Sequence, residues 1–433
     1  MQDGYKHNEY NDGNQEDTYD TDAQSLSLLA AFQARYAPPS HPLQPTDTGV
    51  LRSASFITSN AIDVHIPMLG IQSAARHLHA LMLQRPYSPA TWHSHELHPS
   101  LEDMGGSGEN LVNFIFTMDL LNFSFWSDFD DDDHRRWAVE YRGRRWTGYW
   151  GLVAALRRAI DEAEEGGGVL ITDPALWTSD ACTLEAVQHV FRSATAEPMP
   201  MLEERWQCLR GAGEILDTNF SSSVSELLAT ASDSAVLLIN TLTNTFPCFN
   251  DTHSLDEKPV HFHKRAQIFV ADLWACFSLY PESKYGKFED VDGITMFADY
   301  RIPQMLRTLG CLEYSPSLEA RIRRKEVLRS GSRKEVEIRG SSVWAVECLR
   351  KEIVRSEDVR MAEDQAERDG AERREKLEVN AILIDFFLYD LAKEKEAEEK
   401  RKRDDSDSKD QGQQAFEHNG GMIPHHRTRS IWY

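Results

Sequence analysis

Apolar residues recur at every third or fourth position through much of this chain, and this spacing restricts its fold more than any other feature. It is typical of helices that bury one face. Residues 149–160 show it clearly, because their basic side chains fall on the face opposite the apolar one. The same pattern covers residues 183–191, 201–209, 263–277 and 379–391. We therefore predict a mainly α protein that forms a single large helical domain.

Strand-like patterns are few in this sequence. The candidates are residues 114–125, 137–141 and 169–171, which together predict a small β element near residues 112–142. Residues 335–349 also begin with an alternating pattern, and we expect them to turn helical after Gly340. No internal repeat is evident.

The two ends of the chain differ in composition from the helical region at 50–395. Residues 1–49 are acidic and then rich in proline, which predicts a disordered arm. Residues 396–420 are dense in charged and polar side chains and predict a flexible spacer that begins as a frayed helix. Residues 421–433 become basic and aromatic again, so we expect them to dock back on the domain.

The charge balance excludes several classes of function. The 433 residues carry 70 Asp and Glu against 47 Lys and Arg, a net charge of −23, which does not suit a protein that grips long nucleic acid. No apolar run approaches the roughly 20 residues that span a bilayer. The acidic N-terminus does not resemble a secretory signal, and the six scattered cysteines predict buried free thiols. We therefore predict no membrane association and a cytoplasmic protein, with the nucleus as the alternative.

Asp299 stands where an apolar run passes into a helical pattern that stops at Gly310. Its carboxylate fits a helix N-cap, and Pro303 fits the first turn, where its missing N–H costs little. One interpretation is therefore a simple capping residue. The other is a carboxylate directed from the start of a helix into a cleft. The flanking Phe297 and Tyr300 favour the second, because they are hard to explain as exposed residues around a plain cap.

Asp385 and Asp390 lie in an otherwise apolar helical segment, and Asp272 lies in another. A carboxylate on such a face must be paired, hydrogen-bonded to a ligand, or shifted in pKa. An ion pair with an arginine is the simpler interpretation. The functional interpretation is an aromatic pocket for a planar ligand that carries an amine or a positive charge.

His93, His95 and His98 form a short cluster after Trp92. Their spacing matches no standard zinc pattern, so we expect a pocket-lining or buried histidine here rather than a metal site. The acidic run at 128–133 lacks the ligand register of a calcium loop, and the glycines at 105–108 lack the lysine of a P-loop. We predict no metal.

Several short sequence motifs, taken together, resemble those of the queuosine salvage protein family, the queuosine 5′-phosphate N-glycosylase/hydrolases. In chain order they are LNFSFWS at 121–127, GYWGL at 148–152, KRAQIFVADLW at 264–274, MFADYRIPQ at 296–304, VEIRG at 336–340, LIDFFLYD at 383–390 and PHHRTRSIWY at 424–433. The resemblance runs from about residue 50 to 395 and resumes near the end of the chain. The acidic arm and the charged spacer look like additions.

The resemblance implies a specific reaction. The family releases the base queuine from queuosine 5′-monophosphate and leaves ribose 5-phosphate, for salvage into tRNA modification. It implies a helical fold like that of helix-hairpin-helix DNA glycosylases over residues 50–395. Asp299 matches the aspartate that faces the anomeric carbon at the start of a helix. No cofactor is implied, and the partner is a small-molecule nucleotide rather than a stable nucleic acid complex.

The resemblance also suggests which residues bind the substrate. They are His95, Phe297, Tyr300, Asp385, Phe386 and Asp390. The family often has tyrosine where this chain has Phe386, so any hydroxyl contact is lost there. The phosphate needs cations, and the candidates are Lys264, Arg265 and Arg427, with His425, His426 and Arg429 beside them in the tail.

Two other interpretations remain at this stage. The chain could be a helical scaffold that binds partners, or a glycosylase that acts on another modified nucleotide. The sequence does not separate a covalent from an oxocarbenium-stabilising role for Asp299. It also leaves open the preference for nucleotide over nucleoside and the oligomeric state.

Overall fold

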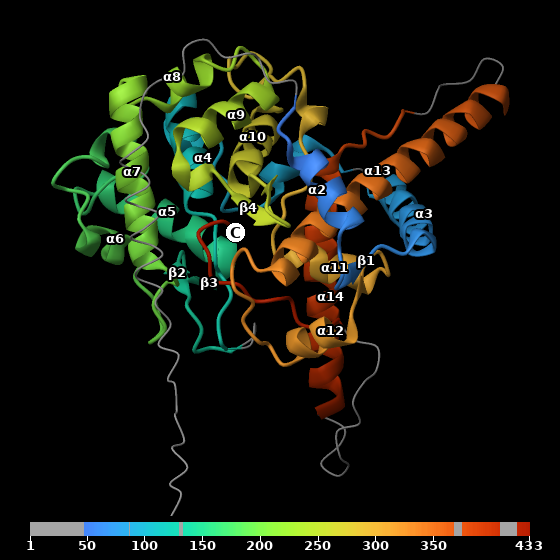
Figure 1. The fold of residues 1–433 in the computed structure, drawn as a ribbon. Coiled ribbons are helices and arrows are strands. Elements are labelled where there is room, and N and C mark those ends of the chain that lie inside the picture. The colour runs from blue at the N-terminus through green and yellow to red at the C-terminus, as the bar shows by residue number, and fades with distance from the viewer. Residues whose placement is uncertain (1–46, 86, 130–132, 368–374, 408–421) are drawn as a thin grey trace, which may run out of the picture. The chain divides into compact units, whose positions relative to one another are not determined.

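Helices make up most of the protein, as the apolar spacing predicts (Figure 1). The computed structural model describes residues 47–85, 87–129, 133–367, 375–407 and 422–433, all within one unit that spans Gln44–Tyr433. The α-helices are α2 (Val50–Ser59), α3 (Met68–Gln84), α4 (Gly108–Leu120), α5 (Gly148–Glu164), α6 (Leu184–Val190), α7 (Leu202–Phe220), α8 (Val224–Ala229), α9 (Ala235–Thr245), α10 (Lys264–Phe277), α11 (Arg301–Thr308), α12 (Pro316–Arg323), α13 (Arg333–Glu367) and α14 (Ala381–Asp407). Among these described helices, none is both long enough and apolar enough to pass through a bilayer.

The helices pack in two groups (Figure 1). In the first, α10 packs against α4 and α9, and α7 packs against α6 and α8. In the second, α13 packs along α2 and α3, and α11 packs against α14. A hydrophobic core of the second group includes Ile57, Leu306, Val346 and Leu388. The end of the described chain lies between the two groups, which brings the tail beside both (Figure 1).

Gly340 sets how closely α13 approaches α2. A Cβ atom at this position would lie 2.5 Å from Cδ1 and 2.6 Å from Cγ2 of Ile57. Only a residue without a side chain lets the two helices touch here, because a core packed at native density has no room for another carbon. The glycine in the middle of a long helix is thus explained by packing and does not end the helix.

Short strands and 3-10 turns connect the helices. The strands pair antiparallel in the described residues: β1 (Val64–His65) with β6 (Glu313–Tyr314), β2 (Val139–Tyr141) with β3 (Arg144–Trp146), and β4 (Thr252–Leu255) with β5 (Lys258–His261). The 3-10 turns are η1 (Pro89–Ser94), η2 (Glu102–Met104), η3 (Pro174–Leu176), η4 (Pro247–Phe249) and η5 (Val291–Gly293). The pairs β2–β3 and β4–β5 are hairpins, whereas β1 and β6 come from distant parts of the chain.

The strand predictions were partly wrong. Residues 114–125 are not a strand, because 114–120 belong to α4 and 121–127 are irregular. Every residue of α4 from Phe114 to Leu120 is buried, and a helical segment that is buried all round gives the same uninterrupted pattern as a buried strand. Of the predicted β element only β2 lies within 112–142, and residues 169–171 form no strand. The helix at 335–349 begins already at Arg333, so the prediction of a start after Gly340 was also wrong.

The two ends are described only in part. Residues 1–46 of the predicted arm, residues 408–420 of the predicted spacer and residue 421 of the predicted docking segment lie outside the described residues. Helix α14 continues through the first part of the spacer to Asp407. Residues 422–433 lie against the body, where the Trp126 indole N–H donates to the carbonyl of Thr428 at 2.7 Å and the Ser124 N–H donates to the carbonyl of Tyr433 at 3.0 Å.

Replacement of Gly340 by alanine should destabilise the protein even though alanine favours helices. The added methyl group overlaps Ile57, and such overpacking costs about 2 kcal/mol of unfolding free energy. Ile57→Ala in the same chain removes two of the three Ile57 atoms that the methyl group meets. Denaturant unfolding of the double variant should therefore show a smaller loss than the sum of the single variants. Additive losses would contradict this account of Gly340.

Candidate functional site

A cavity of about 870 Å³ opens between residues from distant parts of the chain. Its walls come from η1, the segment 122–129, the start of α5, one face of α10, the loop before α11, α14, and the tail at 422–433. Aromatic side chains and carboxylates are both present on these walls. A ligand pocket of this size takes a molecule as large as a nucleotide.

Asp299 lines the cavity and also caps α11. Its Oδ1 accepts hydrogen bonds from the backbone N–H groups of Arg301 at 2.8 Å and Ile302 at 3.0 Å. Pro303 lies in the first turn and Gly310 follows the end of the helix with φ 73°, as the sequence predicts. The two interpretations of Asp299 are thus compatible. Burial raises the pKa of Asp299, while the charge of Lys264 and the two backbone hydrogen bonds oppose the rise.

Asp385 lies on α14 and faces the loop that carries Asp299. It is 5% exposed, and its Oδ2 accepts a hydrogen bond from the backbone N–H of Phe297 at 2.9 Å. Its partner is therefore a main-chain amide and not the arginine of the simpler interpretation. Burial raises the pKa of Asp385 well above its ordinary value, and the nearby charge of Asp299 adds to this rise.

Lys264 brings a positive charge to this group of acids. Its Nζ donates to the carbonyl oxygen of Asn122 at 3.2 Å and to its Oδ1 at 3.3 Å. Burial raises the pKa of Asp272, which also lines the cavity, well above its ordinary value, and raises that of Asp119, which is not a lining residue, to about 7. Lys264 acts against the pKa rise at all four of these aspartates. Asp119 was missed by the sequence analysis, although an acid within the apolar run 114–121 gives the same signal as Asp272.

Aromatic rings form part of the cavity lining. Phe297 and Phe386 lie with ring centroids 6.0 Å apart at 52°, next to the two central carboxylates. Tyr300 packs against His425 of the tail at 4.6 Å. These surfaces can hold a planar heterocycle through stacking and edge contacts.

The predicted histidine cluster separates into three environments. His95 lines the cavity and stacks on Trp150, and its Nδ1 accepts from the backbone N–H of Leu97 at 3.2 Å, which leaves the neutral ring's proton on Nε2. His98 is hydrogen-bonded to the Trp92 carbonyl at 2.6 Å and to the Tyr149 hydroxyl at 2.8 Å. Burial lowers the pKa of His98 to about 3.

No set of three or more His, Cys, Asp or Glu side chains suited to a metal ion occurs within the described residues. His93 is held by the carbonyl of Cys276 at 2.7 Å. The three histidines therefore do not converge on one point.

Asp390 lies at the rim of the cavity on the last turn of the apolar part of α14. Its carboxylate accepts a hydrogen bond from the hydroxyl of Tyr87. Tyr87 in turn packs edge-on against Phe387 with ring centroids 5.5 Å apart. This contact closes one side of the cavity, and burial raises the pKa of Asp390.

The three cations predicted for the phosphate do not share one location. Lys264 and Arg427 line the cavity, but Arg265 does not. The guanidinium of Arg265 is 1% exposed and donates to the carbonyls of Leu120 and Cys248. The Leu120 carbonyl at the end of α4 and the Cys248 carbonyl in η4 bind this positive charge, so Arg265 has a structural role and the prediction of a phosphate contact is not supported.

The tail forms one wall of the cavity. Arg427 lies with its Nη1 3.2 Å from Oδ1 of Asp128, and Arg429 lies over the ring of Trp126 at 3.5 Å. His426 is buried and hydrogen-bonded to the Tyr433 hydroxyl at 3.1 Å, and it is not among the residues that line the cavity. Of the tail cations, Arg427 and His425 reach the cavity.

The fold and the cavity together define a mainly helical protein with a ligand pocket whose central groups are a capping carboxylate and a second, buried carboxylate. The sequence profile described as "Queuosine salvage protein" matches residues 97–433. The chain belongs to this family.

Relatives within the family cover most of the chain. A fission yeast protein (Schizosaccharomyces pombe) named queuosine 5′-phosphate N-glycosylase/hydrolase is 38% identical over 353 residues, which is 80% of this chain and 92% of that protein. Proteins of the same name from Nematostella vectensis and Mus musculus are 36% and 35% identical and are covered over 97% and 99% of their lengths. The likeness therefore extends over nearly the whole of each relative.

Substitution of Asp385 by asparagine should raise the melting temperature at neutral pH. A carboxyl whose folded pKa is raised loses stability as pH rises above its unfolded pKa of about 4, and asparagine removes this cost while its Oδ1 can still accept from Phe297. The difference in Tm between variant and parent should vanish below pH 4. Asp251→Asn is the opposing control. Although burial of Asp251 acts to raise its pKa, the charge of Arg339 lowers the pKa overall, so this variant should lower Tm. A lower Tm for both variants would contradict the prediction.

Proposed function

We propose that this protein hydrolyses the N-glycosidic bond of queuosine 5′-monophosphate and releases queuine. One observation carries the proposal: in a member of this family, the Asp299 carboxylate lies at the start of α11 on the wall of an aromatic cavity. The relatives from yeast, sea anemone and mouse bear the name of that activity. The reaction needs no redox chemistry and no group transfer to a second substrate.

Asp299 would act on the sugar. As the bond between C1′ and the base nitrogen breaks, the electron pair leaves with the base and C1′ gains oxocarbenium character. An ionised carboxylate beside C1′ stabilises that positive charge or traps it as an ester. Water then supplies its oxygen to C1′, and its proton ends on the released base. The capping hydrogen bonds hold the Asp299 Oδ1, which fixes the direction of the carboxylate.

The base is a poor leaving group, because queuine is a 7-deazaguanine and has no N7 to protonate. Hydrogen bonds to other atoms of the base must therefore take up the charge. Asp385 suits this role, since its raised pKa favours a protonated carboxyl that donates a hydrogen bond. Phe297 and Phe386 would enclose the ring, and the Nε2–H of His95 would donate to its edge.

The remaining site residues would hold the outer parts of the substrate. The 5′-phosphate would lie toward Lys264 or Arg427, which are candidate cations on the cavity wall. Tyr300 and Asp390 are polar groups on the cavity wall and would bind the sugar hydroxyls or the side-chain ammonium of the base. The similarity to helix-hairpin-helix glycosylases remains a prediction, supported by the position of Asp299 at the beginning of a helix.

Asp299→Asn should abolish release of queuine from queuosine 5′-monophosphate, by about 10²-fold or more, because a neutral amide cannot balance the charge at C1′. Asparagine can still cap α11, so the fold should survive. The matched control is Asp290→Asn, a capping carboxylate that accepts from the Ala235 N–H and does not line the cavity.

Chromatography of the products from queuosine, its 5′-monophosphate and unmodified purine nucleotides tests the assignment. Equal turnover by Asp299→Asn would exclude the catalytic role. Turnover of another nucleotide in place of queuosine 5′-monophosphate would redirect the proposal to that substrate.

Lys264→Met should shift the pH profile of kcat/KM. If Asp299 acts when ionised, activity falls as pH falls through the pKa of Asp299. Lys264 lowers that pKa, so loss of its charge should raise it and move the acidic limb to higher pH. Lys393→Met removes another cavity-lining lysine, whose Nζ lies 2.9 Å from Oε2 of Glu396, and should leave the limb in place. An unchanged limb in Lys264→Met would contradict the coupling.

A further inference from the structure

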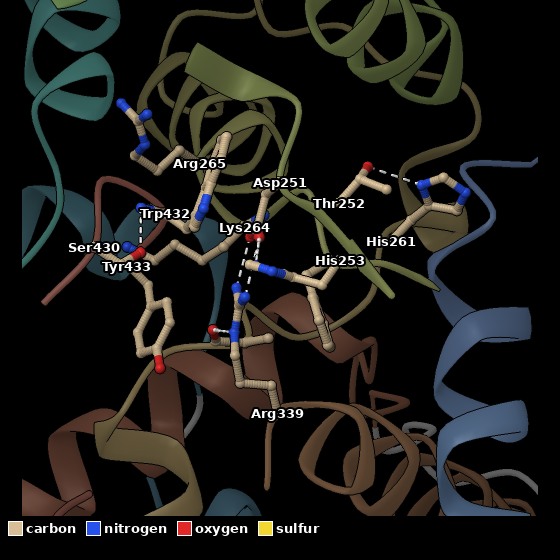
Figure 2. A network of polar contacts seen from close by, with 12 residues as sticks. Asp251, Thr252, His253, His261, Lys264, Arg265, Arg339, Ser430, Trp432 and Tyr433 are labelled. Carbon is tan, nitrogen blue, oxygen red and sulfur yellow. Dashed lines mark hydrogen bonds and ion pairs between the residues drawn. The ribbon is translucent and has the colours of Figure 1, made fainter. Parts of the chain in front are cut away.

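Arg339 is a fully buried arginine on α13 that reaches the loop in front of Asp299 (Figure 2). Its Nη1 and Nη2 donate to the two carboxylate oxygens of Asp251 at 3.0 and 2.6 Å. Its Nε donates to the carbonyl of Ala298 at 2.9 Å. One planar group therefore binds a carboxylate in bidentate fashion and also holds the residue immediately before Asp299.

Two rings fix the plane of this guanidinium. Its central carbon lies 4.1 Å from the ring centroid of Phe262 and 4.2 Å from that of Tyr433. Figure 2 shows the Tyr433 ring beside Arg339, with Asp251 beyond the guanidinium. Tyr433 is itself held by the N–H of Ser124, which donates to its carbonyl at 3.0 Å. The position of Arg339 therefore depends on the tail.

Asp251 also has further partners that keep it in place. Its Oδ2 accepts from the backbone N–H of Lys264 at 3.3 Å, and its Oδ1 lies 3.4 Å from Nε2 of His253. Glu335, one turn before Arg339 on α13, lies 3.6 Å from Nη1 of Arg339. The ion pair thus connects α13 with the first residue of α10.

The loop that carries Asp299 has no regular structure of its own. Residues 294–300 lie between η5 and α11 and belong to no strand or helix. Three successive residues are held by three different elements: the Phe297 N–H by Asp385 of α14, the Ala298 carbonyl by Arg339 of α13, and the Asp299 carboxylate by the start of α11. Release of the middle contact would let the peptide between Ala298 and Asp299 rotate, and with it the Cα–Cβ bond of Asp299.

We propose that Arg339 is a positioning residue for Asp299, and that Tyr433 couples the position of Asp299 to the docked tail by covering the Arg339 guanidinium. This proposal rests on the function proposed above. Catalysis by a carboxylate requires placement within about 0.5 Å of its productive position, and a displacement of about 1 Å can cost 10²-fold in rate. The alternative is a buried ion pair that serves stability alone.

Arg339→Lys separates the two roles. Lysine keeps a positive charge beside Asp251 but cannot bind both carboxylate oxygens and the Ala298 carbonyl in one plane. The positioning role predicts that kcat, per mole of folded enzyme, falls by about 10²-fold while KM stays within about threefold. The matched control is Arg157→Lys, which alters another buried arginine paired with an aspartate, Asp103, but contacts neither the cavity nor the Asp299 loop. It should lower Tm and leave kcat unchanged.

Tyr433→Ala tests the connection to the tail. The substitution removes one of the two rings that pack on the Arg339 guanidinium, so kcat should fall. If both residues act through the same contact, the double variant Arg339→Lys/Tyr433→Ala should have a kcat close to that of the slower single variant. Multiplicative losses would overturn the coupling through Tyr433. If Arg339→Lys fails to fold, the single variant Tyr433→Ala still tests the coupling, because an unchanged kcat in that variant would overturn it.

A crystal structure of Arg339→Lys gives a readout that does not depend on turnover. A displaced Ala298–Asp299 peptide supports the proposal, and an unmoved Asp299 carboxylate overturns it. If the unmodified enzyme releases queuine and Arg339→Lys keeps its kcat, only the positioning role fails. If the unmodified enzyme cleaves no nucleotide, the proposed function fails, and the structural comparison still decides whether Arg339 places Asp299.

Discussion

Burial of negative charge around Lys264 is the constraint on which the site depends. Asp119, Asp272, Asp299 and Asp385 all feel the charge of this one lysine, and burial raises the pKa of each despite it. Carboxylates removed from water are costly unless they are paired and hydrogen-bonded. The cavity therefore has more acid than base at its centre. In the proposed reaction, positive charge that develops on the sugar would meet three lining carboxyl groups, those of Asp272, Asp299 and Asp385, with Lys264 among them.

The four aspartates around Lys264 share one positive charge, whereas the nearby Asp251 has an arginine of its own. Asp251 and Arg339 meet through two hydrogen bonds between two rings, and the partners keep the pKa of Asp251 low, so this pair favours the folded state at neutral pH. The raised pKa of Asp385 has the opposite effect and reduces the stability of the folded state at neutral pH. The loop that carries Asp299 is hydrogen-bonded to both Arg339 and Asp385. The site therefore contains an ion pair that stabilises the fold and a buried carboxyl group that destabilises it.

The sequence predicted the helices and the central carboxylates because both leave local signals. Apolar spacing identified α5, α10 and α14, and an acid within an apolar run identified Asp385. Helix α4 was mistaken for a strand, since a segment buried on all sides has no polar face to show its period. Arg265 was assigned to the phosphate because its charge is visible in the sequence, while the carbonyls that bind it are not. Asp251 and Arg339 are 88 residues apart, and only the fold brings them together.

The place of the tail in the cavity wall has a consequence for biosynthesis. Residues 422–433 supply His425 and Arg427 to the wall and Tyr433 to the cover of Arg339, yet they follow every other element of the site in the chain. A ribosome that has made the whole helical body still carries a chain whose cavity is open on that side. Synthesis must pass residue 433 before the site is enclosed, so a prematurely stopped chain would retain most of the hydrophobic core and lack a finished pocket.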